Sequence, residues 1–349
     1  MKRAGLVAIA LLAILFSTVF ATSTRSADPP TAATPTSATP AAATPAAATP
    51  ASCKVGVDVL TLHGINLDDN TFDAGFWIWS VCPNDQFKPL TTMEFVNADS
   101  ATVSMQGGEV KDGMYWDYAR VDGTFRYPWN LKDFPFDSHT LQIRIEDSSS
   151  NASIFVYEPD TAGSALEPDL PLEGFNIAGF NIGSSVHSYQ TTYGDPQNPA
   201  GTSDYSRLTV GIELQRRDFS GFLKLTFVVY MAFLLSLVSY FINLKNPTML
   251  TARIGMISGA LFAVAVNFRT ATTALSSAEG LTMAGLIHAV TLVAIVVDAA
   301  AALVAQTRIE HGYSEEAARQ FDRRVMLTVV TIYVVFNICL IGFVWLRNT

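Results

Sequence analysis

Residues 206–243, SRLTVGIELQRRDFSGFLKLTFVVYMAFLLSLVSYFIN, contain the point at which the character of the chain changes. Residues 206–215 are typical of a β-strand, whereas residues 221–243 form a predominantly apolar run that is long enough to cross a membrane as a helix. Most acidic residues precede position 220, and the long apolar runs follow it. The sequence therefore predicts a strand-rich soluble domain followed by a membrane domain.

Four apolar runs in the second part are each long enough to span a hydrocarbon core of about 30 Å. Lys245 and Arg253 flank the first connection and four arginines lie in the third, whereas the second, residues 276–280, has no basic residue. Because cytoplasmic connections are enriched in Lys and Arg, we expect a multi-pass protein of the inner (plasma) membrane whose strand domain lies outside. The predicted transmembrane domain spans 218–349, with helices near 221–243, 252–274, 281–305 and 325–346.

Residues 1–21 have the features of a signal peptide, since Lys2 and Arg3 precede an apolar stretch that ends in small residues. The alternative is a permanent anchor, which such a short run disfavours because a span needs about 20 residues. Residues 22–52 are rich in Ala, Thr and Pro, which predicts a flexible linker. Export agrees with an N-terminal domain outside the membrane.

Residues 53–217 contain short β-branched and aromatic segments separated by turn residues, which predicts an extracellular domain with an immunoglobulin-like β-sandwich fold; its ligand-sensing role is implied only by the resemblance described below. The first two segments form a hairpin about a turn at residues 66–70, and Cys53 and Cys82 are equidistant from its centre. We therefore predict a disulfide between them at the open end of the hairpin. Two free thiols are the alternative, which export to an oxidising compartment disfavours. The predicted fold class is thus an all-β sandwich plus an all-α four-helix bundle.

The second apolar run contains polar residues that would be costly against lipid. One face of this helix, with residues spaced by four and three positions, changes from small to apolar to polar along its length. Several copies would surround a pore whose apolar constriction at Phe262 and Val266 could gate by dewetting. A bundle-core helix whose glycines permit close packing is the alternative. The predicted pore-lining residues are Gly255, Gly259, Phe262, Val266, Arg269 and Thr273.

Two motifs stand out, YPWNLKDFPFDSHTL at residues 127–141 and ARIGM at residues 252–256. The first lies in the predicted sandwich, and the second lies at the start of the second of the four predicted helices that follow it. In these motifs and this order the chain resembles the pentameric ligand-gated ion channels (Cys-loop receptors), particularly their prokaryotic branch, over about residues 55–347. The resemblance implies a homopentamer in membrane lipid that opens in response to a small molecule, protons or calcium. The chain departs from the family in lacking a proline in the first apolar run and an acidic ring before the pore helix.

The resemblance also implies a coupling role for the loop that carries the Phe-Pro-Phe-Asp motif. The loop would lie at the membrane end of the sandwich, with a cis bond before the proline, its phenyl rings against residues 274–280, and its aspartate paired with an arginine above the first helix. An ordinary β-turn with two surface charges is the alternative. The predicted coupling residues are Phe134, Pro135, Phe136, Asp137 and Arg216.

Members of this family bind ligands with aromatic side chains at subunit interfaces, and the chain offers several candidates. The predicted ligand-binding residues are Phe95, Tyr157, Tyr193 and Tyr205 on one subunit, with Trp77, Trp79 and Trp116 on its neighbour. For Trp77 and Trp79, which share one strand face, a place in the sandwich core is the favoured alternative.

Three charged residues in the predicted helices invite specific hypotheses. Arg253 and Asp298 are expected at similar depths, so they could pair, or Arg253 could simply mark the cytoplasmic boundary. A ring of arginines at Arg269 would attract anions, which favours anion selectivity, unless Arg269 turns aside toward the extracellular domain.

A ligand-gated channel is the leading functional hypothesis, and a non-conducting periplasmic sensor on the same scaffold is the alternative. A membrane enzyme is disfavoured because the sequence has no nucleophile–His–acid set, no metal-ligand spacing and no phosphate-binding glycine loop. We therefore expect no cofactor and no metal site. The net charge of −9, without a basic block, argues against nucleic acid as a partner.

Overall fold

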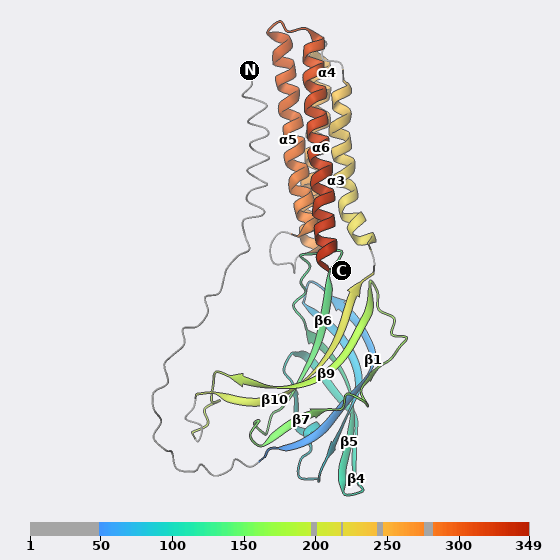
Figure 1. Cartoon of the computed structure of the whole chain (residues 1–349), viewed down its shortest axis with the longest axis vertical. Coiled ribbons are helices and arrows are strands. Elements are labelled where there is room, and N and C mark those ends of the chain that lie inside the picture. Colours follow the sequence, from blue (N-terminus) through green and yellow to red (C-terminus); the bar gives the residue numbers. More distant parts are fainter. Residues whose placement is uncertain (1–48, 197–200, 218, 243–246, 276–281, 349) are drawn as a thin grey trace. The chain divides into compact units, whose positions relative to one another are not determined.

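The computed structural model describes residues 49–196, 201–217, 219–242, 247–275 and 282–348, and shows a β domain followed by four long apolar helices (Figure 1). Each of the four helices is long and apolar enough to cross a membrane. The predicted signal peptide and all but the last residues of the predicted linker lie outside the described residues.

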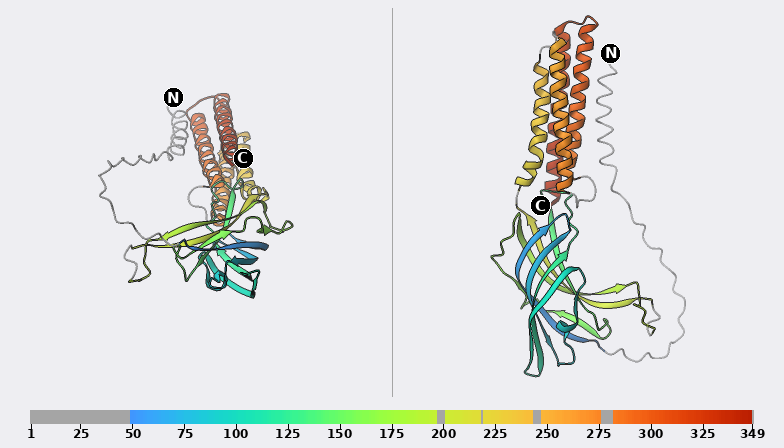
Figure 2. Two further views of the ribbon diagram at one scale, coloured as in Figure 1. Left: turned by 60° about the horizontal axis from the view of Figure 1, so that its bottom comes forward. Right: turned by 180° about the vertical axis from the view of Figure 1, so that it is seen from behind.

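The β domain is built from two sheets that pack face to face as a sandwich (Figures 1 and 2). One sheet has the order β4 (Ala98–Lys111), β5 (Met114–Arg126), β2 (Thr71–Cys82), β1 (Ala51–Asn66) and β7 (Phe155–Pro159), with β8 (Ala165–Leu166) also paired to β1. The other has the order β3 (Met93–Phe95), β6 (Ser138–Asp147), β10 (Ser203–Arg216) and β9 (Phe175–Tyr189). A short helix, α2 (Pro89–Thr92), precedes β3.

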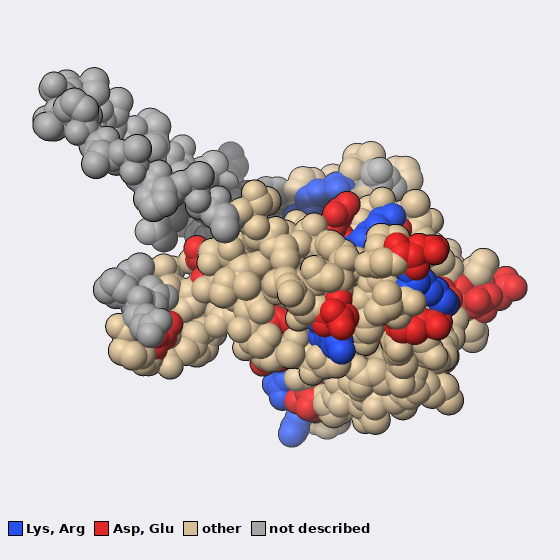
Figure 3. Space-filling model, turned by 90° about the horizontal axis from the view of Figure 1, so that it is seen from below, with Lys and Arg blue, Asp and Glu red and all other residues tan. Residues whose placement is uncertain are grey.

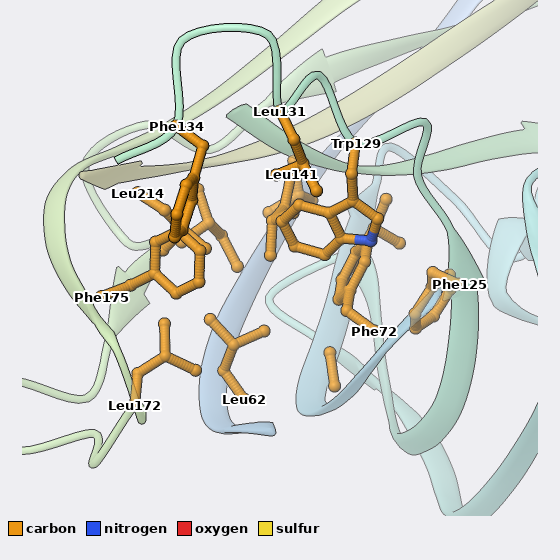
Figure 4. Close-up of a cluster of buried hydrophobic side chains, with 14 of the residues drawn as sticks. Leu62, Phe72, Phe125, Trp129, Leu131, Phe134, Leu141, Leu172, Phe175 and Leu214 are labelled. Atoms are coloured by element: carbon orange, nitrogen blue, oxygen red, sulfur yellow. The ribbon is translucent and has the colours of Figure 1, made fainter. Parts of the chain in front are cut away.

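The sandwich core follows from the alternation of side chains along the strands. From the larger sheet, Val55, Val57, Phe76, Ile78 and Val121 are almost wholly buried. From the smaller sheet, Leu141, Ile143, Ile145, Leu208 and Val210 face them. Figure 4 shows one end of this core, where Trp129, Phe134 and Phe175 gather around Leu141 and Leu214.

The predicted disulfide between Cys53 and Cys82 is confirmed, with the two Cα atoms 4.4 Å apart. Strands β1 and β2 pair in the register that a symmetric hairpin requires, from Lys54 opposite Val81 to Val59 opposite Phe76. The register shifts only beyond Val59, nearer the turn, so the two cysteines meet at the open end.

The four long helices are α3 (Ser220–Val238), α4 (Pro247–Ala274), α5 (Met283–Glu310) and α6 (Glu315–Asn348). They run side by side in Figure 1, with α3 prolonged by a 3₁₀ turn, η1 (Ser239–Phe241). Several boundaries differ from expectation, because α4 begins before residue 252, α5 continues beyond residue 305 and α6 begins well before residue 325. The early part of α6 is polar and amphipathic, so a search for apolar runs misses it.

Acidic and basic side chains lie in small mixed groups on the face of the molecule in Figure 3, which looks onto the β domain. The β domain carries exposed ion pairs such as Lys111 with Glu109 and Arg126 with Asp99. Such exposed pairs contribute little to stability.

Candidate functional site

The loop between β5 and β6 ends in a buried ion pair at the junction of the β domain with α3. Arg216 donates from Nε to Asp137 Oδ1 (2.7 Å) and from Nη2 to Asp137 Oδ2 (2.9 Å). The side chains are 1% exposed for Asp137 and 11% for Arg216. Because β6 and β10 pair up to Ser138 and Gln215, the next residues along both strands are brought together. The predicted pair is therefore confirmed, and its role in coupling stays a prediction.

His139 is a third member of this network that the sequence analysis did not assign to it. Its Nε2 lies 2.6 Å from Asp137 Oδ2, and its ring packs against Tyr127, Trp129 and Phe175. Its Nδ1 is buried and has no hydrogen-bond partner in the described part of the chain. His139 continues the inward stripe of β6 through Leu141, Ile143 and Ile145, and this alternation is the signal that could have placed it.

Two opposing effects set the pKa of Asp137. Burial alone would raise it, but the hydrogen bonds from His139 and Arg216, together with their charges, outweigh burial and lower the pKa below its usual value. Asp137 is therefore a carboxylate that holds two donors from different strands.

The phenyl rings of the same loop pack onto the start of α3. Phe134 precedes a cis peptide bond to Pro135, as expected, and the Arg216 guanidinium lies 4.8 Å from the centre of the Phe134 ring. A Cβ added to Gly221 would lie 3.3 Å from Phe134 Cζ, and Phe136 contacts Phe219 with ring centres 5.3 Å apart. The expected packing onto residues 274–280 falls mostly outside the described residues.

The loop also contacts two further helices. The backbone N–H of Met283, at the start of α5, donates to the carbonyl of Lys132 (3.2 Å). Arg347, near the end of α6, forms an ion pair with Asp133. One loop of the β domain therefore contacts α3, α5 and α6, which gives it the connections that a coupling element needs.

Helix α4 leaves one face uncovered in the single chain. Its opposite face, with Ile257, Ala260, Val264 and Ala271, is buried against the neighbouring helices. Between Thr251 and Thr273 the exposed residues are Thr251, Ala252, Gly255, Ser258, Gly259, Phe262, Ala265, Val266, Arg269, Thr270, Thr272 and Thr273. All of the predicted pore-lining residues belong to this set, which we call the α4 exposed face.

The glycines of α4 do not serve close packing within the chain. A Cβ added to Gly255 or to Gly259 would meet no atom of another described element within 4 Å. Within the described part of one chain, the glycines therefore make no close contact, and close packing against another copy stays the alternative. The large apolar side chains of the α4 exposed face over residues 251–273 are Phe262, 72% exposed, and Val266, 51% exposed.

The exposed faces of α3 and of residues 325–346 of α6 have a different composition from that of α4, because most of their exposed side chains are large and apolar. On α3 these are Leu223, Phe227, Val228, Met231, Leu234, Leu235 and Val238. On α6 they are Leu327, Val334, Val335, Ile338, Phe343, Trp345 and Leu346. Such faces suit contact with lipid, whereas glycine, serine, threonine and arginine do not.

The expected pairing of Arg253 with Asp298 is wrong in its choice of acid. Arg253 is fully buried and donates from Nη1 to Asp322 Oδ2 of α6 (2.7 Å). Asp298 contacts Ser236 and Tyr240 instead. Asp322 was missed because it precedes the apolar run from which the fourth helix was predicted.

Three tyrosines form an aromatic cluster at the end of the β9–β10 hairpin. Tyr189, Tyr193 and Tyr205 have ring centres 5.8 to 6.2 Å apart. Glu146 accepts from Arg207 Nε (2.6 Å) and from the Tyr189 hydroxyl (3.0 Å) beside them. Burial and the neighbouring Glu146 raise the pKa of Tyr189. Tyr193 and Tyr205 are thus placed where a ligand could reach them.

Two other predicted ligand-binding residues differ in burial. Tyr157 is 3% exposed and lies in the core, so the prediction for Tyr157 needs correction. Phe95 is half-buried and packs edge-to-face on Phe76 and Phe125, and its role in ligand binding stays a prediction.

The tryptophans occupy the outer face of the larger sheet rather than its core. Phe76 and Ile78 take the inward positions of β2, which leaves Trp77 and Trp79 facing outward. With Trp116 and Tyr118 they line a shallow hollow of about 380 Å³. The core alternative for Trp77 and Trp79 is therefore wrong.

The predicted ligand residues are thus divided between the outer faces of two sheets. The tyrosine cluster belongs to the β9–β10 side, and the tryptophan panel to β2 and β5. A single chain does not bring the two groups together, so a site that uses both needs a second copy. No family model matches this sequence, and no curated protein matches it either.

Proposed function

We propose that this chain is one subunit of a homopentameric channel of the ligand-gated type, in which α4 lines the pore and the β domain controls it. The observation that carries the proposal is the contrast between the exposed faces of the helices. The exposed faces of α3 and of the apolar part of α6 carry mainly large apolar side chains, which suit lipid, whereas that of α4 carries small and polar residues, which suit an aqueous pore.

The cost of exposing the α4 face to lipid supports this assignment. Arg269 would place a charged guanidinium group in hydrocarbon, which is expensive. The hydroxyls of Thr270, Thr272 and Thr273 donate to carbonyls of their own helix, so this cost comes from Arg269. A ring of copies around an aqueous axis removes this cost, because the polar groups then face water. The small residues Gly255, Ser258 and Gly259 would leave the far end of the axis wide.

Phe262 is the natural constriction of such a pore. It is the largest apolar side chain on the α4 exposed face between residues 251 and 273. A ring of phenyl groups narrows the axis and repels water, so the closed pore would be dry at this level. Arg269 lies two helical turns beyond Phe262. A ring of its guanidinium groups would make the electrostatic potential in the pore positive at that level, which favours anions.

The loop at residues 127–137 would carry the signal from the β domain to the pore. Asp137 of this loop pairs with Arg216 at the end of β10, just before α3. The loop also contacts α5 through Lys132 and α6 through Asp133. The ligand would bind where the tyrosine cluster of one subunit meets the tryptophan panel of the next. A movement of β10 there is transmitted along the same strand to Arg216.

Current recording with two matched phenylalanine variants tests the proposal. Phe262→Ala should open the pore without ligand, because removing the phenyl ring wets the constriction. Phe227→Ala is the control, since Phe227 is 63% exposed on the lipid-type face of α3. The purified full chain in planar bilayers should conduct spontaneously with Phe262→Ala, and should behave as wild type with Phe227→Ala.

Accessibility of an introduced thiol tests the wet face without any need for current. In a Cys339→Ala background, which removes the exposed free thiol of α6, Val266→Cys should react with a charged, membrane-impermeant thiol reagent and Phe227→Cys should not. Equal protection of both would argue against a water-filled axis. Pentamers that show a reactive Val266→Cys but no current, across ligands and pH, would favour the non-conducting sensor.

A further inference from the structure

A buried polar network lies among the four helices, at the end of α3 that is remote from β10. Arg253 of α4 pairs with Asp322 of α6, and its guanidinium carbon lies 4.8 Å from the centre of the Tyr240 ring. Tyr240, in turn, donates its hydroxyl to Asp298 Oδ1 of α5 (2.8 Å). Tyr240 therefore contacts both the arginine and the second carboxyl group. Arg253 and Asp298 are fully buried, and Asp322 is 3% exposed.

The two contacts of Ser236 bear on whether Asp298 carries a proton. Its Oγ is 2.8 Å from the carbonyl oxygen of Phe233 and 2.8 Å from Asp298 Oδ2. A serine hydroxyl has one hydrogen, so it can donate to only one of two acceptors. When Ser236 donates to the carbonyl, as serines in helices commonly do, the second contact is a hydrogen bond only if Asp298 carries the proton.

The count of charges leads to the same assignment. One cation, Arg253, faces two acids, and its direct ion pair is with Asp322. A second ionised carboxylate in this fully buried place would have no cation of its own, which is very unfavourable. A protonated Asp298 is satisfied on both oxygens, since it accepts from Tyr240 and donates to Ser236.

Arg253 has donors to spare for another partner. Its Nε and Nη2 are buried and have no hydrogen-bond partner among the described residues, and Asp322 Oδ1 is in the same position. A buried donor that lacks a hydrogen-bond partner destabilises the folded state. The pairing with Asp322 is therefore incomplete, and a second carboxylate close by would compete for the guanidinium.

We propose that Asp298 is a proton-binding site, and that loss of its proton to water draws Arg253 from Asp322 toward Asp298. Ser236 would then donate to the new carboxylate instead of to the Phe233 carbonyl. The titratable and charged groups that face Asp298 from the described parts of the packed elements are Tyr240 of η1, Arg253 of α4 and Asp322 of α6. Asp298 is the one whose ionisation changes the balance, because Arg253 and Asp322 neutralise each other.

The consequence for the pore rests on the proposed function. Arg253 lies two residues before Gly255 on α4, so a change in its partner shifts the first turns of the pore-lining helix. The proton would thus act on the wide end of the pore, far from the ligand-sensing domain. The proton-binding site itself depends only on the network and not on whether the chain conducts.

Infrared difference spectroscopy of the full-length protein tests the site directly. A protonated carboxyl group has a C=O stretch that a carboxylate lacks and that shifts when H₂O is exchanged for D₂O. Recording in an Asp117→Asn background removes a deeply buried carboxyl of the β domain whose pKa is raised by burial. The spectrum should contain one carboxyl band that disappears in Asp298→Asn.

Ser236→Ala locates the band independently, because loss of the hydrogen bond to Ser236 should shift its frequency without abolishing it. A band that survives Asp298→Asn, or one that is insensitive to Ser236→Ala, would overturn the assignment. In bilayers, currents of the wild type should depend on the pH at the Arg253 end, and those of Asp298→Asn should not. A carboxyl band with pH-independent currents would leave the proton site standing and refute only its action on the pore.

Discussion

Replacing Asp137 by asparagine removes one charge from the junction between the β domain and α3 while keeping the shape of the side chain. Asp137 accepts two hydrogen bonds from Arg216 and one from His139, at 2.6 to 2.9 Å. Asparagine can still accept at its oxygen, but its amide nitrogen opposes the donors that met the second carboxylate oxygen. Arg216 is then left as a nearly buried cation without an anion.

The burial of the pair sets the size of the effect. Breaking a buried ion pair by removing one partner costs about 3–5 kcal/mol. An exposed pair is worth about 0–1 kcal/mol. Asp99→Asn is the matched control, because its pair with Arg126 is 49% and 68% exposed at the two side chains. We therefore expect Asp137→Asn to destabilise the β domain by about 3 kcal/mol or more, and Asp99→Asn by less than about 1 kcal/mol.

Tryptophan fluorescence during urea unfolding measures this difference in the full chain. Trp129 suits the purpose because its ring centre lies 5.0 Å from that of His139. The double variant Asp137→Asn/Arg216→Gln should cost less than the sum of the single variants, since the second change removes the stranded cation. Equal costs for Asp137→Asn and Asp99→Asn, or full additivity in the double variant, would refute the buried network.

The pH dependence of the free energy of unfolding tests whether Asp137 stabilises the folded state as a carboxylate. The folded-state pKa of Asp137 is lowered from 3.8, so its stabilisation is complete above that value. The stabilisation should be lost as the pH falls through the folded-state pKa. Asp137→Asn should therefore lose most of its disadvantage in strong acid, and a constant difference at all pH values would contradict this assignment.

Three further predictions concern the pore, a buried acid and the disulfide. Arg269→Ala should move the reversal potential in asymmetric chloride toward cation permeation, and an unchanged potential would exclude Arg269 as the selectivity residue. Burial raises the pKa of Asp117 from 3.8 despite its hydrogen bond from Ser80, so ionisation disfavours the folded state as the pH rises above that value; Asp117→Asn should raise the melting temperature at pH 7 and change it little near pH 4. Loss of the bond between Cys53 and Cys82, which closes a separation of 29 residues, should cost about 3–4 kcal/mol in urea unfolding of Cys53→Ser/Cys82→Ser. Cys339→Ser, which alters an exposed free thiol, should change the free energy of unfolding by less than about 0.5 kcal/mol and serves as its control.

Local periodicity made much of the architecture predictable. The hairpin was predictable from its turn and flanking strands, but the exact register was not, because two shifts between Val59 and Asn66 bring Cys53 opposite Cys82. The face of α4 was predictable, since residues spaced by four and three positions must share one side of a helix. The pairing of Asp137 with Arg216 was expected from the resemblance of residues 127–141 to a family motif. The two side chains meet because β6 begins, and β10 ends, beside them.

Long-range choices between equivalent partners were not predictable. Alternation along β2 shows that Trp77 and Trp79 share a face, but it does not say which face meets the other sheet. Phe76 and Ile78 take the core, where Phe76 packs against Phe125 of the adjacent strand β5 and against Phe95 of the other sheet. The partner of Arg253 depended in the same way on the rotation and axial offset of three helices, which placed Asp322 rather than Asp298 within hydrogen-bonding distance.

The sequence by itself therefore determined which residues share a face and where the strands and apolar helices run, because these depend on periods of two and of about 3.6 residues along one segment. Only the tertiary structure decided which of those faces is buried. It turned the α4 stripe outward, enclosed His139 with Asp137, and set the tyrosines and tryptophans on opposite sheets. These outcomes depend on how separate elements fill one another's surfaces, which no single segment encodes.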